Sequence, residues 1–172
     1  MNVQEMYQRS NEADEIIPGL WLGNRAAAGD VSFAKQKNIR AIFNCTKDIP
    51  FLNADIPRKY RVPVDDSLQK EDIDKLESWS YEIVYKISQE YRRGQAEGSA
   101  VLVHCAAGMQ RSAASVAMYL IATQNMTTDQ AITYIQSKRP IAFRPGANFE
   151  KSVRTFEAGF NRDVRPALAV PK

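Results

Sequence analysis

The chain has 172 residues, of which 44% are hydrophobic and 25% are charged, and its net charge is +3. This length and composition predict one compact domain and argue against a mainly disordered chain. No apolar run reaches the roughly 18–20 residues of a membrane-spanning helix, and the polar residues 1–15 do not resemble a signal peptide. We therefore expect a soluble intracellular protein, cytoplasmic or nuclear, that binds no membrane. The positive excess in residues 144–172 is too weak to indicate nucleic-acid binding.

The apolar pattern alternates between short runs typical of buried strands and the three-and-four spacing typical of helices. In chain order the predicted elements are a frayed helix or arm over 1–14, a hairpin over 15–23 turning at Pro18-Gly19, a helix over 31–38, strands over 40–46 and 60–64, a helix over 71–93, a strand over 99–105, and helices over 111–124, 128–138 and 147–159. Asp30 is a candidate helix N-cap, and Thr127 with Gln130 predicts a capping box. Pro63 suggests that its strand lies at a sheet edge or that the strand ends there.

This order of strands and helices predicts an α/β fold, with a central, mostly parallel sheet of about five strands and helices on both faces. The continuous apolar run SAVLVHC over 99–105 is typical of a central strand. We expect one folded domain over 15–160, preceded by the arm 1–14 and followed by an aperiodic tail over 161–172. The arm could mediate a homodimer, because amphipathic N-terminal helices can exchange between subunits.

The most informative stretch is VLVHCAAGMQRSAASVAMYL, residues 101–120, in which a buried strand delivers Cys105 to a loop that opens a helix. The loop amides of 106–111 and the helix dipole favour a thiolate, which is the nucleophilic form of cysteine. The same amides, from Ala106, Ala107, Gly108, Met109, Gln110 and Arg111, would bind a tetrahedral oxyanion such as phosphate. Gly108 allows the tight backbone path.

Two further side chains complete this predicted anion site. The planar guanidinium of Arg111 binds two phosphate oxygens at once, which a lysine could not do. The hydroxyl of Ser112 could reach the cysteine sulfur and stabilise it as a leaving group. A structural cysteine beside a surface arginine is the alternative interpretation, and the combined pattern strongly disfavours it.

The two cysteines and the single histidine exclude other kinds of site. Cys45 and Cys105 form no disulfide framework, and two cysteines with one histidine give no zinc pattern. His104 is a poor base for Cys105, because neighbouring side chains on a strand point to opposite faces. We expect neither a metal nor a cofactor, since the guanidinium and the amides supply the positive charge.

The segment His104-Cys105-x-x-Gly108-x-x-Arg111-Ser112 resembles the signature of the cysteine-dependent phosphatases, and over about 15–159 the chain is similar to the small dual-specificity phosphatases. The segments that carry this likeness are Leu20 to Asn24, Ile39 to Asn44, Arg139-Pro140 and Asn148-Phe149. The resemblance implies a cysteine phosphatase-like fold and a phosphorylated protein substrate. It also implies that Asn148 braces the phosphate loop and that His104 forms hydrogen bonds around the cysteine. The chain is most similar to the atypical small subgroup, which also occurs in large DNA viruses.

A phosphate ester needs an acid to protonate its leaving oxygen, a contribution of about 10²–10⁴-fold. The candidates are Asp65 and Asp66 in VPVDDS, and the family pattern favours Asp66, with Asp65 as a solvated or capping carboxylate. Cys105 would then attack phosphorus while Asp66 protonates the leaving group, and Asp66 would later activate the water that hydrolyses the phosphocysteine.

Several alternatives remain open at this level. The substrate could be a non-protein phosphate, such as an RNA 5′ end, a lipid or a glycan, or the chain could be a catalytically silent phosphate-binding module. By analogy with some relatives, Cys45 could form a protective disulfide with Cys105, although a buried core cysteine is the more ordinary role. Arg25, Lys47 and Arg144 could receive a second phosphate or an acidic peptide, although each is more ordinarily a solvated charge.

Overall fold

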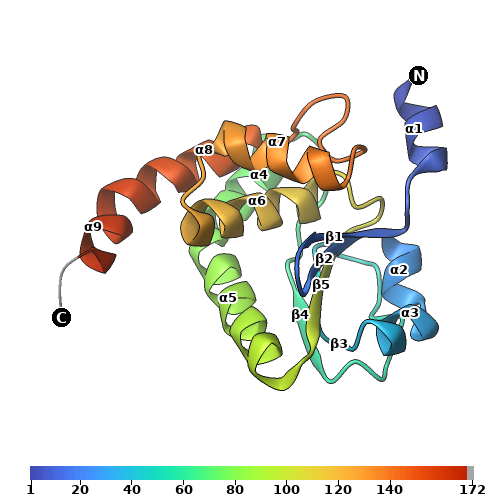
Figure 1. Ribbon diagram of the computed structural model, residues 1–172. Helices are drawn as coiled ribbons and strands as arrows, with labels where there is room; N and C mark the ends of the chain where they lie inside the picture. Colours follow the sequence, from blue (N-terminus) through green and yellow to red (C-terminus); the bar gives the residue numbers. More distant parts are fainter. Residues whose placement is uncertain (170–172) are drawn as a thin grey trace.

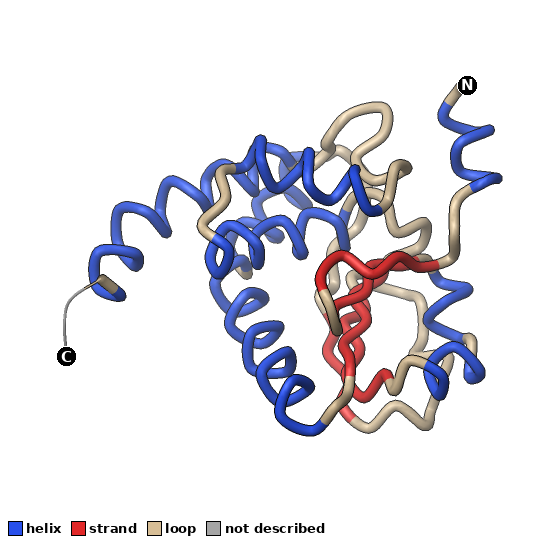
Figure 2. Tube along the Cα trace, in the orientation of Figure 1, coloured by secondary structure: helices blue, strands red, loops and turns tan. Residues whose placement is uncertain are grey.

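In the computed structural model, which describes residues 1–169, five strands form one sheet between two groups of helices (Figures 1 and 2). The strands are β1 (Ala13–Ile17), β2 (Leu20–Gly23), β3 (Ile39–Asn44), β4 (Arg58–Arg61) and β5 (Ala100–His104). Their order across the sheet is β1-β2-β5-β3-β4, in which β1 is antiparallel to β2 and the other neighbours are parallel. The prediction of a mostly parallel sheet with 99–105 at its centre is confirmed.

Helices cover both faces of the sheet, as predicted. The helical elements are α1 (Val3–Arg9), α2 (Arg25–Gly29), α3 (Val31–Gln36), α4 (Lys70–Ser78), α5 (Ser80–Glu97), α6 (Arg111–Gln124), α7 (Thr128–Lys138), α8 (Glu150–Gly159), the π-helical turn η1 (Phe160–Val164) and α9 (Arg165–Leu168). Alternate residues of β5 serve two cores: Val101 and Val103 pack with α4 to α8, whereas Leu102 packs with α2 and α3. Figure 1 shows the two groups of helices on opposite sides of β5.

Several local signals act as the sequence indicates. Gly19 has a φ of +90° at the turn between β1 and β2, a conformation that favours glycine. The Asp30 side chain accepts a hydrogen bond of 3.0 Å from the Phe33 amide and caps α3. Both hydrogen bonds of the Thr127–Gln130 capping box are present at the start of α7. Helices α3 and α7 therefore begin at their predicted first residues, directly after these caps.

The predicted helix over 71–93 is instead two helices, α4 and α5, that meet at Trp79, where ψ of 2° leaves the helical region. Helix α5 also runs past Gly94 and ends at Gly98, which has a φ of +75°. Gly94 is needed for packing rather than for a turn, because a Cβ there would lie 2.5 Å from the carbonyl oxygen of Ser99.

Other elements also differ from the prediction. Helix α2 was not predicted, because its five residues carry no periodicity, yet Asn24 caps it. The edge strand β4 begins and ends earlier than the predicted 60–64. The tail predicted over 161–172 is helical through η1 and α9 as far as Leu168, and its residues 170–172 lie outside the described part.

The predicted arm over 1–14 contains α1 and the first residues of β1. None of the residues of α1 is buried, and Figure 1 shows this helix projecting from the rest of the fold. Within the part of the chain that the structure describes, no helix is both long and apolar enough to cross a membrane.

Candidate active site

Cys105 follows the last residue of the central strand β5, and α6 begins six residues later. The carboxyl ends of parallel strands are where α/β proteins place their ligands. The intervening loop turns sharply at Gly108, which has a φ of +67°, and a Cβ there would lie 2.5 Å from the carbonyl oxygen of Gly23. A residue with a side chain would therefore disturb both the loop conformation and its packing on β2.

The Cys105 sulfur is buried, with 3% of the residue exposed, and it lies 3.0 Å from the hydroxyl oxygen of Ser112. Burial by itself would raise the pKa of this thiol. Hydrogen bonds from the Ser112 hydroxyl and backbone amide, the charge of Arg111 and the Gly108 amide outweigh burial and bring the pKa of Cys105 below its ordinary value. The site therefore favours the nucleophilic thiolate.

Arg111 is the first residue of α6 and is almost buried, with 8% of its surface exposed. Its Nη1 donates to the carbonyl oxygen of Val64 at 3.1 Å. Its Nε is also buried, and no residue of the described chain accepts a hydrogen bond from it. A buried guanidinium N–H without an acceptor is costly, so this arrangement suits an oxyanion ligand beside Cys105.

A cavity of about 210 Å³ opens over this loop. Its lining residues are Asp66, Cys105, Ala106, Ala107, Met109, Gln110, Arg111, Arg144 and Asn148. The structure thus brings the candidate acid to the same cavity as the candidate nucleophile. Asp65 is absent from that lining, and its Oδ1 accepts a hydrogen bond of 3.1 Å from the Asp66 amide.

His104 is buried in the sheet, and its Nδ1 lies 3.2 Å from the carbonyl oxygen of Cys105, to which it donates. Burial, reinforced by the nearby positive charges of Arg61, Arg111 and Arg25, lowers the pKa of His104 to about 4. The imidazole is therefore neutral near pH 7, and its hydrogen bond goes to the Cys105 backbone rather than to the sulfur.

Asn148 contacts the phosphate loop through its backbone and the candidate acid through its side chain. Its side-chain Nδ2 donates to Oδ1 of Asp66 at 3.1 Å, so the side chain holds the candidate acid rather than the phosphate loop. Only its backbone amide touches that loop, by donating to Oε1 of Gln110 at 2.9 Å.

Two other side chains brace the loop. Arg139 is fully buried and donates from Nε to the carbonyl of Gly108 at 2.8 Å and from Nη2 to that of Ala107 at 3.1 Å. Its Nη1 donates to Asp14 at 2.8 Å. The Gln110 amide joins the loop to the segment 144–148. The sequence indicates Arg139 only as part of a segment that resembles the family, because its partners lie far away in the chain.

Cys45 is fully buried at the end of β3, and its sulfur lies 3.7 Å from the hydroxyl of Ser115. Burial, together with the charge of Cys105, raises the pKa of Cys45 to about 12. The sulfur of Cys45 is thus a protonated thiol near pH 7, whereas the pKa of Cys105 is shifted in the opposite direction, and both cysteines are free.

Of the three candidate residues for a second anion site, Arg144 alone lines the cavity. Its Nε donates to the carbonyl of Pro140 at 3.2 Å. Lys47 lies 3.7 Å from Asp72, and Arg25 contributes a backbone amide to the carbonyl of Ala106. No group of three or more potential metal ligands occurs among residues 1–169.

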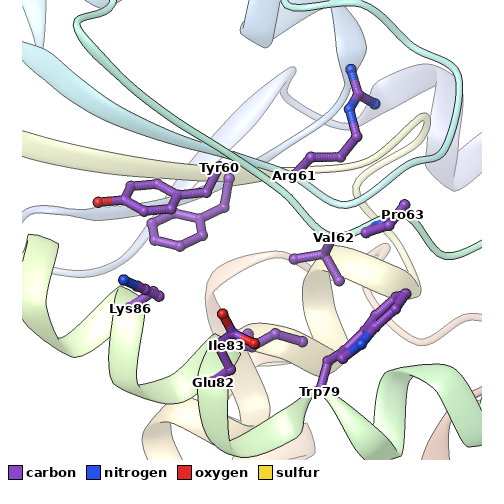
Figure 3. Close-up of a pocket in the computed structure, with 9 residues that line it drawn as sticks. Tyr60, Arg61, Val62, Pro63, Trp79, Glu82, Ile83 and Lys86 are labelled. Atoms are coloured by element: carbon purple, nitrogen blue, oxygen red, sulfur yellow. The ribbon is translucent and has the colours of Figure 1, made fainter.

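A separate cavity of about 240 Å³ lies between the edge strand β4 and the start of α5 (Figure 3). Figure 3 shows Trp79 and Pro63 at one end of this cavity and Lys86 near Tyr60 at the other. It contains neither Cys105 nor the loop after it. Its wall at Pro63 is continuous in sequence with the segment that carries Asp66.

Comparison with known proteins agrees with this geometry. The family model for the dual specificity phosphatase catalytic domain matches residues 20–159. Dual specificity protein phosphatase 1 of Arabidopsis thaliana is 32% identical over 157 residues, which are 91% of this chain and 75% of the relative. Other curated relatives are longer, and the chain spans only 22% of the mouse protein phosphatase Slingshot homolog 3.

Two solved structures show the same fold. Human DUSP28 matches with a TM-score of 0.76 at 24% identity, covering 88% of this chain and 96% of its own. A mouse putative dual specificity phosphatase, crystallised as a complex with zinc tungstate, matches with a TM-score of 0.70 at 25% identity. That match covers 87% of this chain and 89% of the mouse chain.

Proposed function

The chain belongs to the dual specificity phosphatase family, whose members are phosphoric monoester hydrolases acting on proteins, and we propose that it hydrolyses phosphotyrosine and phosphoserine/threonine through a phosphocysteine intermediate. The observation that carries this proposal is the position of Arg111 at the start of the helix that follows the Cys105 loop. Its Nε is buried, and no described residue accepts a hydrogen bond from it. Together with the lowered pKa of Cys105, it provides an anion site beside a nucleophile.

In the first step, the Cys105 thiolate attacks phosphorus and forms an S–P bond. The P–O bond to the substrate breaks, and its electron pair passes to the leaving oxygen, which takes the proton of the Asp66 carboxyl. The loop amides and Arg111 hold the three remaining phosphate oxygens. The products of this step are the dephosphorylated side chain and the phosphocysteine.

In the second step, the Asp66 carboxylate takes a proton from water while the water oxygen attacks phosphorus. The S–P bond breaks, its electron pair returns to sulfur, and inorganic phosphate is formed. The hydroxyl of Ser112, 3.0 Å from the sulfur, stabilises the departing thiolate. Asp66 is protonated again at the end, so the cycle closes.

The size of the cavity supports the dual specificity. It holds about 210 Å³, and Asp66 at its mouth is exposed. A small site whose acid is exposed suits the short phosphoserine side chain as well as the longer phosphotyrosine.

Two features also support an intracellular site of action: the nucleophile must remain a reduced thiol, and both cysteines are free.

Hydrolysis of para-nitrophenyl phosphate in the presence of a chelator tests the mechanism. We expect the wild type to turn over, Cys105→Ser to be inactive, and Asp66→Ala to lose about 10²–10⁴-fold in kcat. Asp65→Ala is the matched control, since this neighbouring carboxylate does not line the cavity, and its loss should be far smaller.

Phosphopeptide panels carrying each phosphorylated residue, set beside RNA 5′-phosphate, lipid and glycan panels, then test the substrate class. Faster hydrolysis of a non-protein phosphate would overturn the protein-substrate proposal. A wild type that binds tungstate or phosphate without hydrolysing any ester would make the chain a phosphate-binding module instead.

A further inference from the structure

The side chain of Gln110 is placed to organise the acid as well as the phosphate loop. This residue precedes α6, and only 5% of its surface is exposed. Its side-chain amide makes three hydrogen bonds to the segment 144–148. The phosphate-binding role predicted for Gln110 concerns its backbone amide and leaves this side chain without a function.

Each polar atom of the Gln110 amide has a partner in that segment. Nε2 donates to the carbonyl of Arg144 at 3.2 Å and to that of Gly146 at 2.8 Å, and Oε1 accepts from the Asn148 amide at 2.9 Å. This set requires two N–H donors and one acceptor at the end of one side chain, which is the inventory of a primary amide. A carboxylate, a hydroxyl or an aliphatic side chain cannot supply it.

The third partner leads directly to the candidate acid. Asn148, whose backbone is fixed by Gln110, donates from its side-chain Nδ2 to Oδ1 of Asp66 at 3.1 Å. A hydrogen bond to Oδ1 leaves Oδ2 as the oxygen that carries the transferable proton. The chain of contacts therefore runs from the phosphate loop, through two amide side chains, to the acid.

Resting on the proposed phosphatase mechanism, we propose that Gln110 is a positioning residue that fixes Asp66, through Asn148, for proton transfer to the leaving group. Asp66 is exposed and lies on a loop, so it needs such a restraint. Proton transfer requires the acid to stay within hydrogen-bond reach of the leaving oxygen. Loss of the amide would let Asp66 move away from that oxygen.

Other contacts keep the segment attached when this amide is removed. The Phe143 amide donates to the carbonyl of Met109 at 2.8 Å, and Arg139 holds the carbonyls of Ala107 and Gly108. Gln110→Met, which preserves the length of the side chain but not its hydrogen bonds, should therefore fold. Its thermal unfolding and tungstate binding can be measured to verify this.

The readout is the ratio of kcat/KM for an activated aryl phosphate to kcat/KM for phenyl phosphate, whose leaving group depends more strongly on an acid. We expect Gln110→Met to lower both values and to raise this ratio about 10-fold, within the total contribution of a general acid. Asn148→Ala should raise the ratio in the same way. A role confined to holding phosphate would lower both values equally.

A double-mutant cycle gives the second test. If Gln110 acts through Asp66, then Gln110→Met should leave the ratio unchanged when introduced into Asp66→Ala, so the two effects are not additive. Gln136→Ala is the matched control, because Gln136 also donates a side-chain amide N–H to a backbone carbonyl nearby in the chain, that of Ala142, which lies outside the segment 144–148. That control should leave the ratio at the wild-type value.

An unchanged ratio in Gln110→Met, or an undiminished effect of it in the Asp66→Ala background, would overturn the positioning role. Failure of the phosphatase mechanism can be distinguished from failure of the positioning role. In the first case, Cys105→Ser would retain activity or the wild type would have none. The two proposals are thus tested by different variants in one set of assays.

Discussion

The hydroxyl oxygen of Ser112 lies 3.0 Å from the sulfur of Cys105, across the turn that joins the phosphate loop to helix α6. This hydrogen bond is the largest of the interactions that lower the pKa of the buried thiol. A single hydroxyl therefore serves the two steps of the proposed reaction: it favours the attacking thiolate first and the departing thiolate later.

Ser112→Ala should raise the pKa of Cys105, because it removes a hydrogen bond to the charged form while burial remains. The rate of Cys105 alkylation by iodoacetamide, measured against pH, should shift to a higher midpoint. Hydrolysis of the phosphocysteine should slow as well, giving a burst of para-nitrophenol followed by a slow phase. Ser115→Ala is the control, since Ser115 contacts Cys45 instead. An unshifted alkylation midpoint would contradict the role of the hydroxyl.

The two cysteines should differ sharply in reactivity. Cys45 has its pKa raised to about 12 and is fully buried, so at pH 7 it stays a protonated and inaccessible thiol. Mass spectrometry of the native protein after brief alkylation should find the label on Cys105 and none on Cys45. We retain the protective disulfide as a proposal, tested by intact mass after mild peroxide. Sulfinic acid on Cys105 without any disulfide would count against it.

Arg139 should be necessary for both stability and phosphate binding. Arg139→Ala removes the ion pair to Asp14 and leaves two loop carbonyls without their donors, a class of change that costs about 3–5 kcal/mol. Denaturant unfolding should show this loss, and tungstate affinity should fall with it. Arg154→Ala removes an exposed ion pair to Asp129, which solvent screens, and should change stability far less. Equal losses in both variants would contradict this account.

Much of the fold and the site could be predicted because the signals are local. A continuous apolar run identifies β5 as the central strand, and the capping box marks the start of α7. The close spacing of Cys105, Gly108 and Arg111 indicates an anion loop, because one strand, one turn and one helix place these residues together. Spacing of this kind involves residues that are close in the chain, so it can be recognised in the sequence without knowledge of the tertiary contacts.

The missed features depend on contacts between distant residues. Arg139 has partners up to 128 residues away, and Asn148 meets Asp66 across 82 residues. The apolar periodicity of a sequence does not predict contacts between residues so far apart in the chain. The division of 71–93 at Trp79 was missed for a related reason, since the apolar spacing continues through the break while the backbone does not.

His104 should make the stability of the protein depend on pH between about 6.5 and 4. Burial lowers the pKa of its ring to about 4 in the folded state, whereas an unfolded histidine titrates near 6.5. Within this window the unfolded state binds a proton that the folded state does not, so stability is greatest above the window and falls as the pH is lowered. The shift corresponds to roughly 3 kcal/mol of folding stability.

Nuclear magnetic resonance can follow this titration. Because the chain has one histidine, its ring resonances can be identified without further assignment. The stability of His104→Asn should change less than that of the wild type across the same window, since both share every carboxylate. A ring midpoint near 6.5 in the folded protein would show that burial does not control this histidine.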